Sequence, residues 1–440
     1  MLNLAKTREF SSMSFGPPLW FSCAACRFCG MITPFGNAQR TGEYSGAAVP
    51  VTPETAWTFR CDAELTGSPA WDGDLVVVLD VDGGVHGLDA ATGERRWSHH
   101  NDWGPASASG SAVITPTGVL HLHEEEIIEL DRHTGEAVRV WDQAGGYITA
   151  LDNILLVDGT HAVDLATRTT LWESQVVASL LAPPAVHDGI VVVTDGFEGH
   201  RVHGGVHAFP KGTGEPLWSI GDRQNAECAA PAQTDGDSTG DWEIPGLTHP
   251  IIADGRVWFT RLRRHDDGVY PHPQPWDGVD FVGCDLETGA EEWTWVPFAG
   301  RHHFEPLKAP AYTNGLLLCI TATAAFDAAD GSHLDAEPEE ILLTALNTRT
   351  PESAWRSPLP GFPVGSPVIA GGVVYLLIHD GTVIALEVAT GRTRWTHRCG
   401  EPVGALPDED AQMFEEEPAR LIPGDGSLLV QTAGTVRLLR

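Results

Sequence analysis

The sequence predicts an all-β protein: one eight-bladed β-propeller of four-stranded antiparallel blades, with the last blade closed by a strand from the N-terminal part of the chain. Three observations predict this fold. A tryptophan motif returns along the 440 residues, each interval between tryptophans holds short apolar strands, and two incomplete units near the ends complement each other. We expect a leader over residues 1–49, with a lead-in segment at 35–49, and the propeller over 50–440.

The motif has an acidic or amide residue, a glycine or proline four residues later, and a tryptophan four residues after that. Copies with this spacing are Asp89/Gly93/Trp97, Asp285/Gly289/Trp293, Glu387/Gly391/Trp395 and Asn347/Pro351/Trp355, and looser copies end at Trp141, Trp172 and Trp218. Intervals between successive tryptophans, counted from Trp57, run from 31 to 75 residues, and several measure 40 to 46. Periods of about 40 to 50 residues are typical of propeller blades.

Residues 364–395, VGSPVIAGGVVYLLIHDGTVIALEVATGRTRW, show the strands of one unit most clearly. A short apolar strand ends at a glycine pair, VVYLLI ends at DG, TVIALEV ends at ATG, and a fourth strand reaches the tryptophan. The DG, GG and TG turns supply the positive φ that tight hairpins require. Each unit therefore predicts four antiparallel strands.

The two ends of the chain predict how the ring closes. The last unit, residues 419–440, stops after a third strand, whereas the residues around Trp57 form a fourth strand without its own unit. Joining them completes an eighth blade and removes the exposed sheet edges that would otherwise pair with other chains.

The xxDxxTGxxxW spacing resembles the tryptophan-docking motif of the pyrroloquinoline quinone (PQQ)-like β-propeller repeat family, which includes quinoprotein alcohol dehydrogenases and the assembly lipoprotein BamB. The resemblance covers nearly the whole chain from Gly36, and FGNAQRTG, residues 35–42, resembles the family's lead-in segment. It implies that each tryptophan packs between neighbouring blades over a turn glycine. This structural role is expected of Trp97, Trp141, Trp172, Trp218, Trp293, Trp355 and Trp395, and of Gly93, Gly289 and Gly391.

The resemblance does not extend to the residues of quinone chemistry. Dehydrogenases of the family clamp PQQ beneath a disulfide between adjacent cysteines and coordinate Ca²⁺ beside a catalytic aspartate. This chain has no adjacent cysteine pair, and Cys61 and Cys399 lie in matching phrases, AWTFRC and RWTHRC, at the ends of outer strands in different blades. Such positions exceed the ~7 Å limit between disulfide-bonded Cα atoms. We therefore expect no cofactor, with PQQ and Ca²⁺ both disfavoured, and we assign no catalytic residue.

Charge and hydropathy exclude several classes of partner. The 60 acidic and 27 basic residues give a formal net charge of −33, which repels nucleic acid and anionic membranes. The sequence contains no apolar run of the ~18 to 20 residues that a membrane span needs, and we recognise neither a signal peptide nor a lipobox. Eight scattered cysteines suit a reducing compartment. We expect a cytoplasmic, monomeric protein.

Long insertions are all expected on one face of the propeller. Three join the second and third strands of a blade, at residues 196–205, 262–280 and 323–340, and four connect blades, at 99–108, 220–247, 297–308 and 400–418. Long loops on a rigid scaffold commonly carry binding sites. Neutral variation of surface loops is the alternative.

The densest chemistry in these insertions lies in RLRRHDDGVYPHPQPWDG, residues 261–278, and in FAGRHHFEP, residues 298–306. These segments predict a pocket for an anion or carboxylate with an aromatic wall. The alternative is that the basic groups neutralise nearby acids such as Asp266 and Asp267. The expected ligand-binding residues are Arg261, Arg263, Arg264, His265, His272, Trp276, Arg301, His302 and His303.

Three patterns suggest metals only weakly. Asp235, Asp237 and Asp241 partly follow a calcium loop, but Gly246 stands where its bidentate glutamate belongs, so a solvated turn is favoured. Cys23, Cys26 and Cys29 have CxxCxxC spacing without a nearby fourth ligand, which favours a disordered leader or a start at Met31. His302, His303 and Glu305 could ligate a metal, but no element converges them. We assign no metal site.

Two functions remain. The first is a noncatalytic propeller that binds a protein or peptide partner through its loop-rich face, as the resemblance to assembly scaffolds implies. The second is a small-ligand-binding or quinoprotein-type oxidoreductase propeller that uses the Arg/His loops of blades five and six.

Overall fold

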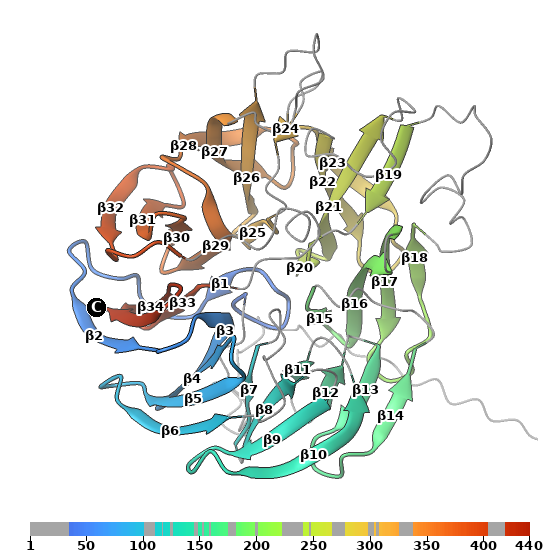
Figure 1. The fold of residues 1–440 in the computed structure, drawn as a ribbon. Coiled ribbons are helices and arrows are strands. Elements are labelled where there is room, and N and C mark those ends of the chain that lie inside the picture. Colours follow the sequence, from blue (N-terminus) through green and yellow to red (C-terminus); the bar gives the residue numbers. More distant parts are fainter. Residues whose placement is uncertain are drawn as a thin grey trace, which may run out of the picture. The chain divides into compact units, whose positions relative to one another are not determined.

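The computed structural model describes most of the chain from residue 35 onward. The described ranges are 35–100, 111–116, 118–123, 126–144, 148–151, 154–157, 160–174, 182–198, 201–221, 241–245, 248–265, 278–297, 303–304, 308–324, 338–403 and 419–440. All of them belong to one compact unit, Met31–Arg440. Eight small antiparallel sheets, each built on four strands, stand in a ring and form an eight-bladed β-propeller (Figure 1). The predicted fold class is confirmed.

Blades 1 to 4 each consist of four consecutive strands, ordered A to D from the centre outward (Figure 1). Blade 1 is β3 (Leu65–Asp72), β4 (Leu75–Asp80), β5 (Gly84–Asp89) and β6 (Arg95–His100); blade 2 is β7 (Val113–Ile114), β8 (Gly118–His123), β9 (Glu126–Asp131) and β10 (Ala137–Ala144); blade 3 is β11 (Ile148–Leu151), β12 (Ile154–Val157), β13 (His161–Asp164) and β14 (Thr170–Glu173); blade 4 is β15 (Ala185–His187), β16 (Ile190–Glu198), β17 (Arg201–Pro210) and β18 (Trp218–Ile220).

Blades 5 to 7 each carry one additional strand, and blade 8 joins the two ends of the chain. Blade 5 is β20 (Ile251–Ala253), β21 (Arg256–His265), β22 (Gly278–Asp285) and β23 (Glu291–Trp295), with β19 (Asp241–Pro245) added to β21; blade 6 is β25 (Ala311–Thr313), β26 (Leu316–Ala324), β27 (Pro338–Asn347) and β28 (Ser353–Pro358), with β24 (His303–Phe304) added to β26; blade 7 is β29 (Pro363–Ala370), β30 (Val373–Ile378), β31 (Thr382–Glu387) and β32 (Thr393–Arg398), with β1 (Glu43–Tyr44) added to β29; blade 8 is β33 (Leu421–Gly424), β34 (Ser427–Gln431), β35 (Thr435–Leu439) and β2 (Thr55–Arg60).

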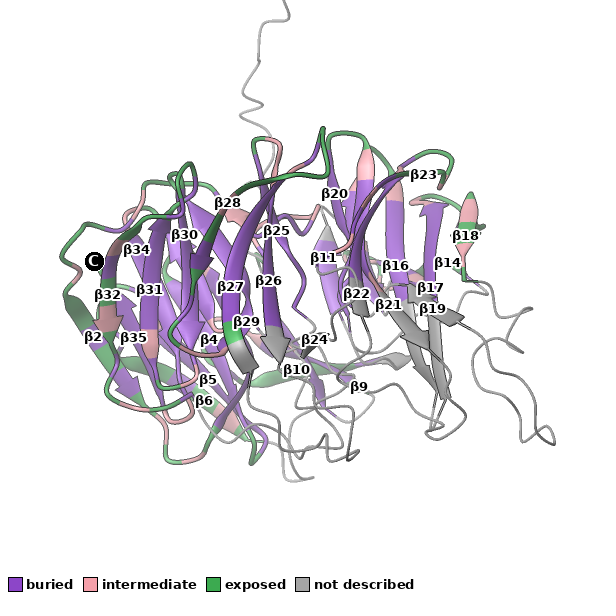
Figure 2. Cartoon of the chain, turned by 90° about the horizontal axis from the view of Figure 1, so that it is seen from above, coloured by how far each residue is buried: buried purple, intermediate pink, exposed green. Residues whose placement is uncertain are grey.

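The core lies between the blades. All six residues of β4 and of β30 are buried, so these strands pack on both faces, whereas β2 at the outer rim alternates between exposed and buried residues (Figure 2). Strands that are buried on both faces read as continuous apolar runs, as in LVVVLD and VVYLLI. Burial of these runs is the main force that holds neighbouring blades together.

The N-terminal strand β2 closes the ring, as predicted. It pairs antiparallel with β35 in a register that places Thr58 opposite Arg437, and the backbones of Glu54 and Arg440 exchange two hydrogen bonds of 2.8 and 2.9 Å. Because β35 and β2 are not consecutive in the chain, no turn joins the two outer strands of blade 8.

The lead-in segment before β2 ties the inner strands together. Arg40 is 1% exposed, and its guanidinium donates to the Pro184 carbonyl at 3.0 Å and to Thr149 Oγ1 of β11 at 2.8 Å. The backbone carbonyls of residues 38, 39, 41 and 42 accept hydrogen bonds from the inner strands of blades 4, 5, 6 and 7, through the amides of Val186, Ile252, Tyr312 and Ile369 respectively. One short segment thus contacts five consecutive blades, 3 to 7.

The tryptophan motif shapes both a turn and a blade contact. In its first copy, Asp89 Oδ1 accepts hydrogen bonds from the amides of Ala91 and Thr92, which is an Asx-type turn, and Gly93 follows at φ +72°. The Trp57 ring of the preceding blade packs against this glycine, so that a Cβ on Gly93 would lie 2.5 Å from Trp57 Cε3. Equivalent pairs are Trp97 with Gly135, Trp172 with Gly214, Trp218 with Gly289, and Trp355 with Gly391.

Three tryptophans depart from this arrangement. Trp141 faces Arg168, which occupies the glycine position at φ +61°, and the guanidinium lies 5.6 Å from the ring centroid. Trp141 Nε1 donates to Glu129 of its own blade at 3.1 Å, instead of to a carbonyl of the next blade. Among the described residues, Trp293 Nε1 and Trp395 Nε1 are buried without a hydrogen-bond acceptor. For Trp395 the cause is topological, because blade 8 has no turn between β35 and β2.

Candidate functional site

The face on which the long insertions were expected carries long second and third strands in three adjacent blades. Strands β16, β17, β21, β26 and β27 have 9 or 10 residues, whereas the equivalent strands of blades 1 and 7 have 6. Antiparallel topology places the end of every second strand and of every fourth strand at the same edge of the ring. The long hairpins of blades 4, 5 and 6 therefore leave the ring on one face.

Several segments expected as loops are strands. In blade 4, β16 extends through residues 196–198 and β17 begins with 201–205. In blade 5, β21 extends through 262–265 and β22 begins with 278–280. In blade 6, β26 extends through 323–324 and β27 begins with 338–340. The predicted connections at 220–247 and 297–308 contribute the additional strands β19 and β24. These corrections share one physical reason: each polar segment has an antiparallel neighbour that completes its backbone hydrogen bonds, whatever its hydropathy.

Four of the residues expected to bind a ligand lie on β21, which pairs with β19. The register places Arg263 opposite Glu243 and His265 opposite Asp241, both on β19. Strand β21 thus carries four residues of the expected basic group, Arg261, Arg263, Arg264 and His265, and the register places two of them opposite acidic positions of β19.

Arg261, at the base of this hairpin, is engaged by two carboxylates. Its guanidinium lies 2.9 Å from Glu291 Oε2 and 3.4 Å from Asp280 Oδ2. The side chains of Arg261 and Asp280 are only 14% and 2% exposed, so this ion pair is shielded from solvent, whereas the Glu291 side chain is 46% exposed and makes its contact at the surface. A buried carboxylate requires such a partner. At this position the structure favours neutralisation of neighbouring acids over capture of a free anion.

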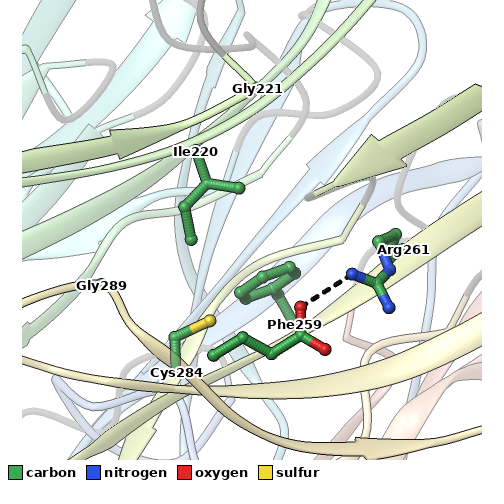
Figure 3. Close-up of a pocket in the computed structure, with 7 residues that line it drawn as sticks. Ile220, Gly221, Phe259, Arg261, Cys284 and Gly289 are labelled. Carbon is green, nitrogen blue, oxygen red and sulfur yellow. Dashed lines mark hydrogen bonds and ion pairs between the residues drawn. The ribbon is translucent and has the colours of Figure 1, made fainter.

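A small cavity opens beside Arg261, between the outer strand of blade 4 and blade 5 (Figure 3). Its volume is about 290 Å³, and its walls include Ile220 of β18, Phe259 of β21 and Cys284 of β22. Burial and the nearby Glu291 charge raise the pKa of the Cys284 thiol to about 12, which is the opposite of what a nucleophilic cysteine needs. The cavity offers an apolar niche next to an ion pair and lacks an activated thiol.

The remaining candidate residues are not brought together by the described part of the chain. His303 lies on β24 of blade 6, and Asp241 lies on β19 in strand conformation. The other candidates lie outside the described residues: His272, Trp276, Arg301 and His302 of the expected binding group, Asp235 and Asp237 of the calcium-like pattern, Glu305, the acids Asp266 and Asp267, and the cysteines Cys23, Cys26 and Cys29.

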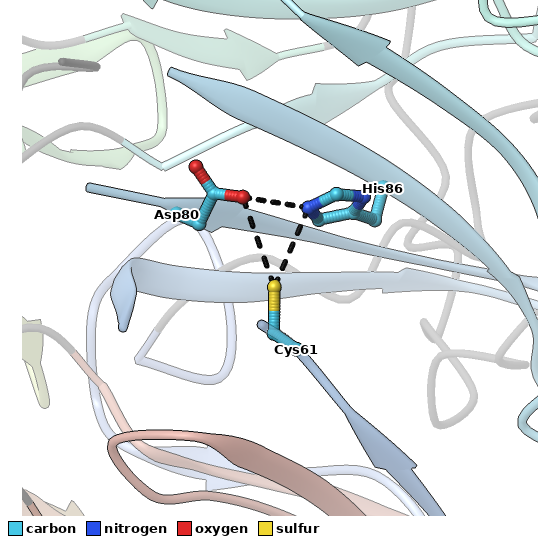
Figure 4. Close-up of side chains that lie close together, drawn as sticks. All are labelled: Cys61, Asp80 and His86. Atoms are coloured by element: carbon cyan, nitrogen blue, oxygen red, sulfur yellow. Dashed lines mark hydrogen bonds and ion pairs between the residues drawn. The ribbon is translucent and has the colours of Figure 1, made fainter. Parts of the chain in front are cut away.

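A second cluster, which the sequence does not predict, lies at the junction of blades 8 and 1 (Figure 4). Cys61 follows β2 directly, Asp80 ends β4, and His86 lies in β5. Cys61 Sγ is 3.7 Å from Asp80 Oδ2 and 3.5 Å from His86 Nε2, and the latter two atoms are 2.8 Å apart. The sequence points to this cluster only through Cys61, which stands at the end of AWTFRC as Cys399 does at the end of RWTHRC. Its contact with Asp80 and His86 is not predictable in this way, because it forms only when the ring closes between blades 8 and 1.

The electrostatics of this second cluster follow from its burial. Burial raises the pKa of the Cys61 thiol, and the Asp80 charge adds to the rise. Burial also acts to raise the pKa of Asp80, but hydrogen bonds from His86 and from the Gly84 amide outweigh it and bring that pKa below its ordinary value. Asp80 is therefore an anion at neutral pH, while the thiol keeps its proton unless a cation approaches.

The fold and its repeated turn motif define a class of repeat propeller, and comparisons with known proteins agree. The PQQ_2 family model, described as outer membrane protein assembly factor BamB, matches residues 44–144, 152–338 and 282–440. The chain therefore belongs to this family of PQQ-like β-propellers.

Individual relatives are distant. The serine/threonine-protein kinase AfsK of Streptomyces coelicolor is 25% identical over 361 residues, covering 79% of this chain and 33% of the kinase. BamB of Yersinia pestis is 25% identical over 166 residues, covering 36% of this chain and 39% of BamB. The chain thus covers less than half the length of each of these curated relatives.

Solved structures of distant proteins share the fold. The quinohemoprotein alcohol dehydrogenase ADHIIG of Pseudomonas putida HK5 superposes with a TM-score of 0.60 at 12% identity, covering 93% of this chain and 80% of that enzyme. At this identity the likeness concerns the fold alone. The part of the chain that the structure describes contains no helix long and apolar enough to cross a membrane.

Proposed function

We propose that this propeller is a noncatalytic module that binds a protein or peptide partner through the face formed by the hairpins of blades 4, 5 and 6. One observation carries the proposal: three adjacent blades extend their second and third strands on the same edge of the ring, and blades 5 and 6 each recruit a further strand there. The result is a broad, strand-built surface on a rigid scaffold, which suits macromolecular contact better than enclosure of a small molecule.

Two further observations support a binding role over catalysis. The guanidinium of Arg261 is already engaged by Asp280 and Glu291, and the adjacent cavity is lined by an unactivated thiol. The model of the family to which the chain belongs is described as an outer membrane protein assembly factor.

The test shortens the blade 5 hairpin without removing its strands. Residues 266–277 are replaced by a two-residue turn, so that β21 and β22 remain paired up to Arg263 and Gly278. A matched control changes the opposite face, with H187Q at the end of β15 and D188N in the tight turn that follows it. Partners captured from the native host are identified and purified, and their affinity for each variant is measured.

We expect the shortened hairpin to weaken binding of the purified partner at least about tenfold, because a central interface element is lost, and the control to bind like the unmodified chain. Equal affinity of all three proteins would refute this hairpin as the binding element. A separate arm adds PQQ with Ca²⁺ and measures the thermal midpoint. A large, saturable stabilisation would favour the ligand-binding alternative.

A further inference from the structure

We propose that Cys61, Asp80 and His86 form a binding site for a thiophilic divalent cation of the Zn²⁺ type, which fastens the closing strand of the propeller to blade 1. The three side chains come from both sides of one blade junction and point toward a common centre (Figure 4). Cys, His and Asp are the ligand types that zinc prefers, and three protein ligands leave a fourth coordination position.

The distances between the three ligand atoms fit a shared ion. Zinc bonds of ~2.0 to 2.3 Å at tetrahedral angles place pairs of ligand atoms ~3.4 to 3.6 Å apart. The Sγ to Nε2 distance of 3.5 Å lies in this range, and the Sγ to Oδ2 distance of 3.7 Å lies just above it. Only the 2.8 Å contact between Nε2 and Oδ2 has to lengthen, because a direct hydrogen bond now occupies that edge.

The same geometry argues against a nucleophilic triad. In a triad the carboxylate holds one imidazole nitrogen while the other nitrogen faces the nucleophile. Here Asp80 Oδ2 and Cys61 Sγ both approach Nε2 of His86. Convergence of a thiol, a carboxylate and an imidazole on one point is the arrangement of ligands around an ion.

The Asp80 carboxylate is positioned for this role by its own turn. Its Oδ1 accepts hydrogen bonds from the amides of Asp82 at 3.0 Å and Gly84 at 2.7 Å, which leaves Oδ2 directed at His86. A Cβ on Gly84 would lie 2.2 Å from Oδ2, so the absence of a side chain there makes room for the carboxylate. Hydrogen bonds that fix a ligating carboxylate are a regular feature of metal sites.

Charge and access also suit a dication. Asp80 and His86 are 5% and 8% exposed, whereas Cys61 is half-buried, so the site opens to solvent on the thiol side. On binding, the Cys61 thiol releases its proton to solvent, and the imidazole proton that now lies between Nε2 and Asp80 moves to Nδ1, so that the neutral ring ligates through Nε2. A thiolate and a carboxylate then balance the two positive charges, which makes the buried site neutral.

The neighbouring junction provides an internal comparison. Cys399 occupies the position of Cys61 on blade 7: the amide of Cys399 donates to the Gly381 carbonyl as that of Cys61 donates to Gly434. The position of His86 on the next blade is taken by Arg437, whose hydrogen bond and charge act on the Cys399 thiol. A guanidinium cannot ligate a cation, so Cys399→Ser is a matched control for Cys61→Ser.

The experiment uses the full chain with Cys23, Cys26 and Cys29 changed to serine, so that the CxxCxxC segment cannot supply thiolates. Chelator-treated protein is titrated with Co²⁺, whose thiolate charge-transfer and d–d bands report sulfur ligation in a tetrahedral site, and Zn²⁺ affinity is measured by competition with a chromophoric chelator. Further variants are C61S, D80N, H86Q, G84A and the control C399S, each checked for folding by circular dichroism.

We expect one Co²⁺ per chain with a charge-transfer band that Zn²⁺ displaces. C61S should abolish the band, C399S should keep it, and D80N and H86Q should each weaken Zn²⁺ binding by at least about 100-fold. G84A, which removes no ligand but displaces Asp80 Oδ2, should weaken it about 10- to 100-fold, the range for residues that orient a ligand. Zn²⁺ should raise the thermal midpoint of the parent but not of C61S.

Either of two results would overturn the proposal: a parent chain without a sulfur-to-cobalt band, or a band that survives in folded C61S. Loss of the band in C399S alone would likewise assign the ion to the blade 7 position and contradict it.

Discussion

The indole ring of Trp97 lies against Gly135 of the following blade, and its Nε1 donates a 2.9 Å hydrogen bond to the Arg132 carbonyl in the same turn. The contact therefore has two components, an apolar ring over a glycine and a directed hydrogen bond. Gly135 combines φ +71° with a Cβ position only 2.5 Å from Trp97 Cε3, so both its backbone and its lack of a side chain are needed.

Gly135→Ala should destabilise the propeller by about 2–4 kcal/mol, because it adds left-handed backbone strain to a steric clash with the ring. Gly73→Ala is the matched control: Gly73 also has positive φ, +57°, but nothing lies within 4 Å of its Cβ position. The control should cost only about 1 kcal/mol. Denaturant unfolding of both variants measures the difference, and equal losses would mean that the indole contact contributes nothing.

Trp97→Phe should cost more than Trp395→Phe, by about 1 kcal/mol, the net value of a typical hydrogen bond. Trp97 Nε1 has the Arg132 carbonyl as acceptor, whereas Trp395 Nε1 has none among the described residues. The two rings are otherwise similarly buried, at 6% and 7% exposure. Unfolding free energies of the two variants check this, and a larger loss in Trp395→Phe would contradict the assigned hydrogen bonding.

Arg168→Gly should destabilise the protein although it restores the residue that most blades carry. Arg168 pairs with Glu129 at 2.9 Å, and the Glu129 side chain is only 9% exposed, so the change leaves a nearly buried carboxylate without its cation. We expect a loss of about 2–3 kcal/mol, discounted because Arg168 itself is partly exposed.

Adding Glu129→Gln should recover part of that loss, since the amide oxygen is neutral and can still accept from Trp141 Nε1. A double-mutant cycle measures the coupling. Strictly additive losses would show that the Arg168–Glu129 pair has no interaction energy.

Because of His121, the free energy of unfolding should decrease as the pH is lowered below about 6.5. Burial lowers the pKa of His121 to about 4, so its folded form stays neutral while the unfolded chain binds a proton near the ordinary value of about 6.5. Between these two values the unfolded state holds the extra proton, and stability decreases as the pH falls. The slope of unfolding free energy against pH is proportional to the number of protons taken up on unfolding. In His121→Gln this number should be smaller by about one across this window. An unchanged slope would place the titration elsewhere.

The repeat explains why the fold was predictable. Asp89 and Gly93 form a turn through local hydrogen bonds and a positive φ, so the turn can be recognised from their spacing in a single sequence. The same is true of the incomplete unit that β2 completes. The ring, the blade count and the closure follow from local patterns that recur.

The site was less predictable because it depends on pairing between segments with no repeat. Strand β19 is identified by its partner β21, not by its own hydropathy, and the register with Glu243 could not be foreseen for Arg263. Likewise, Cys61 meets His86 only because the ring closes between blades 8 and 1.

The most direct test of the proposed binding face is hydrogen–deuterium exchange on the complex with a purified partner. Amide protection on binding should be concentrated in the hairpins β16–β17, β21–β22 and β26–β27, with little change in the tight turns of the opposite face. Protection confined to those tight turns, or to the outer strands of blades 1, 7 and 8, would contradict the proposed binding face.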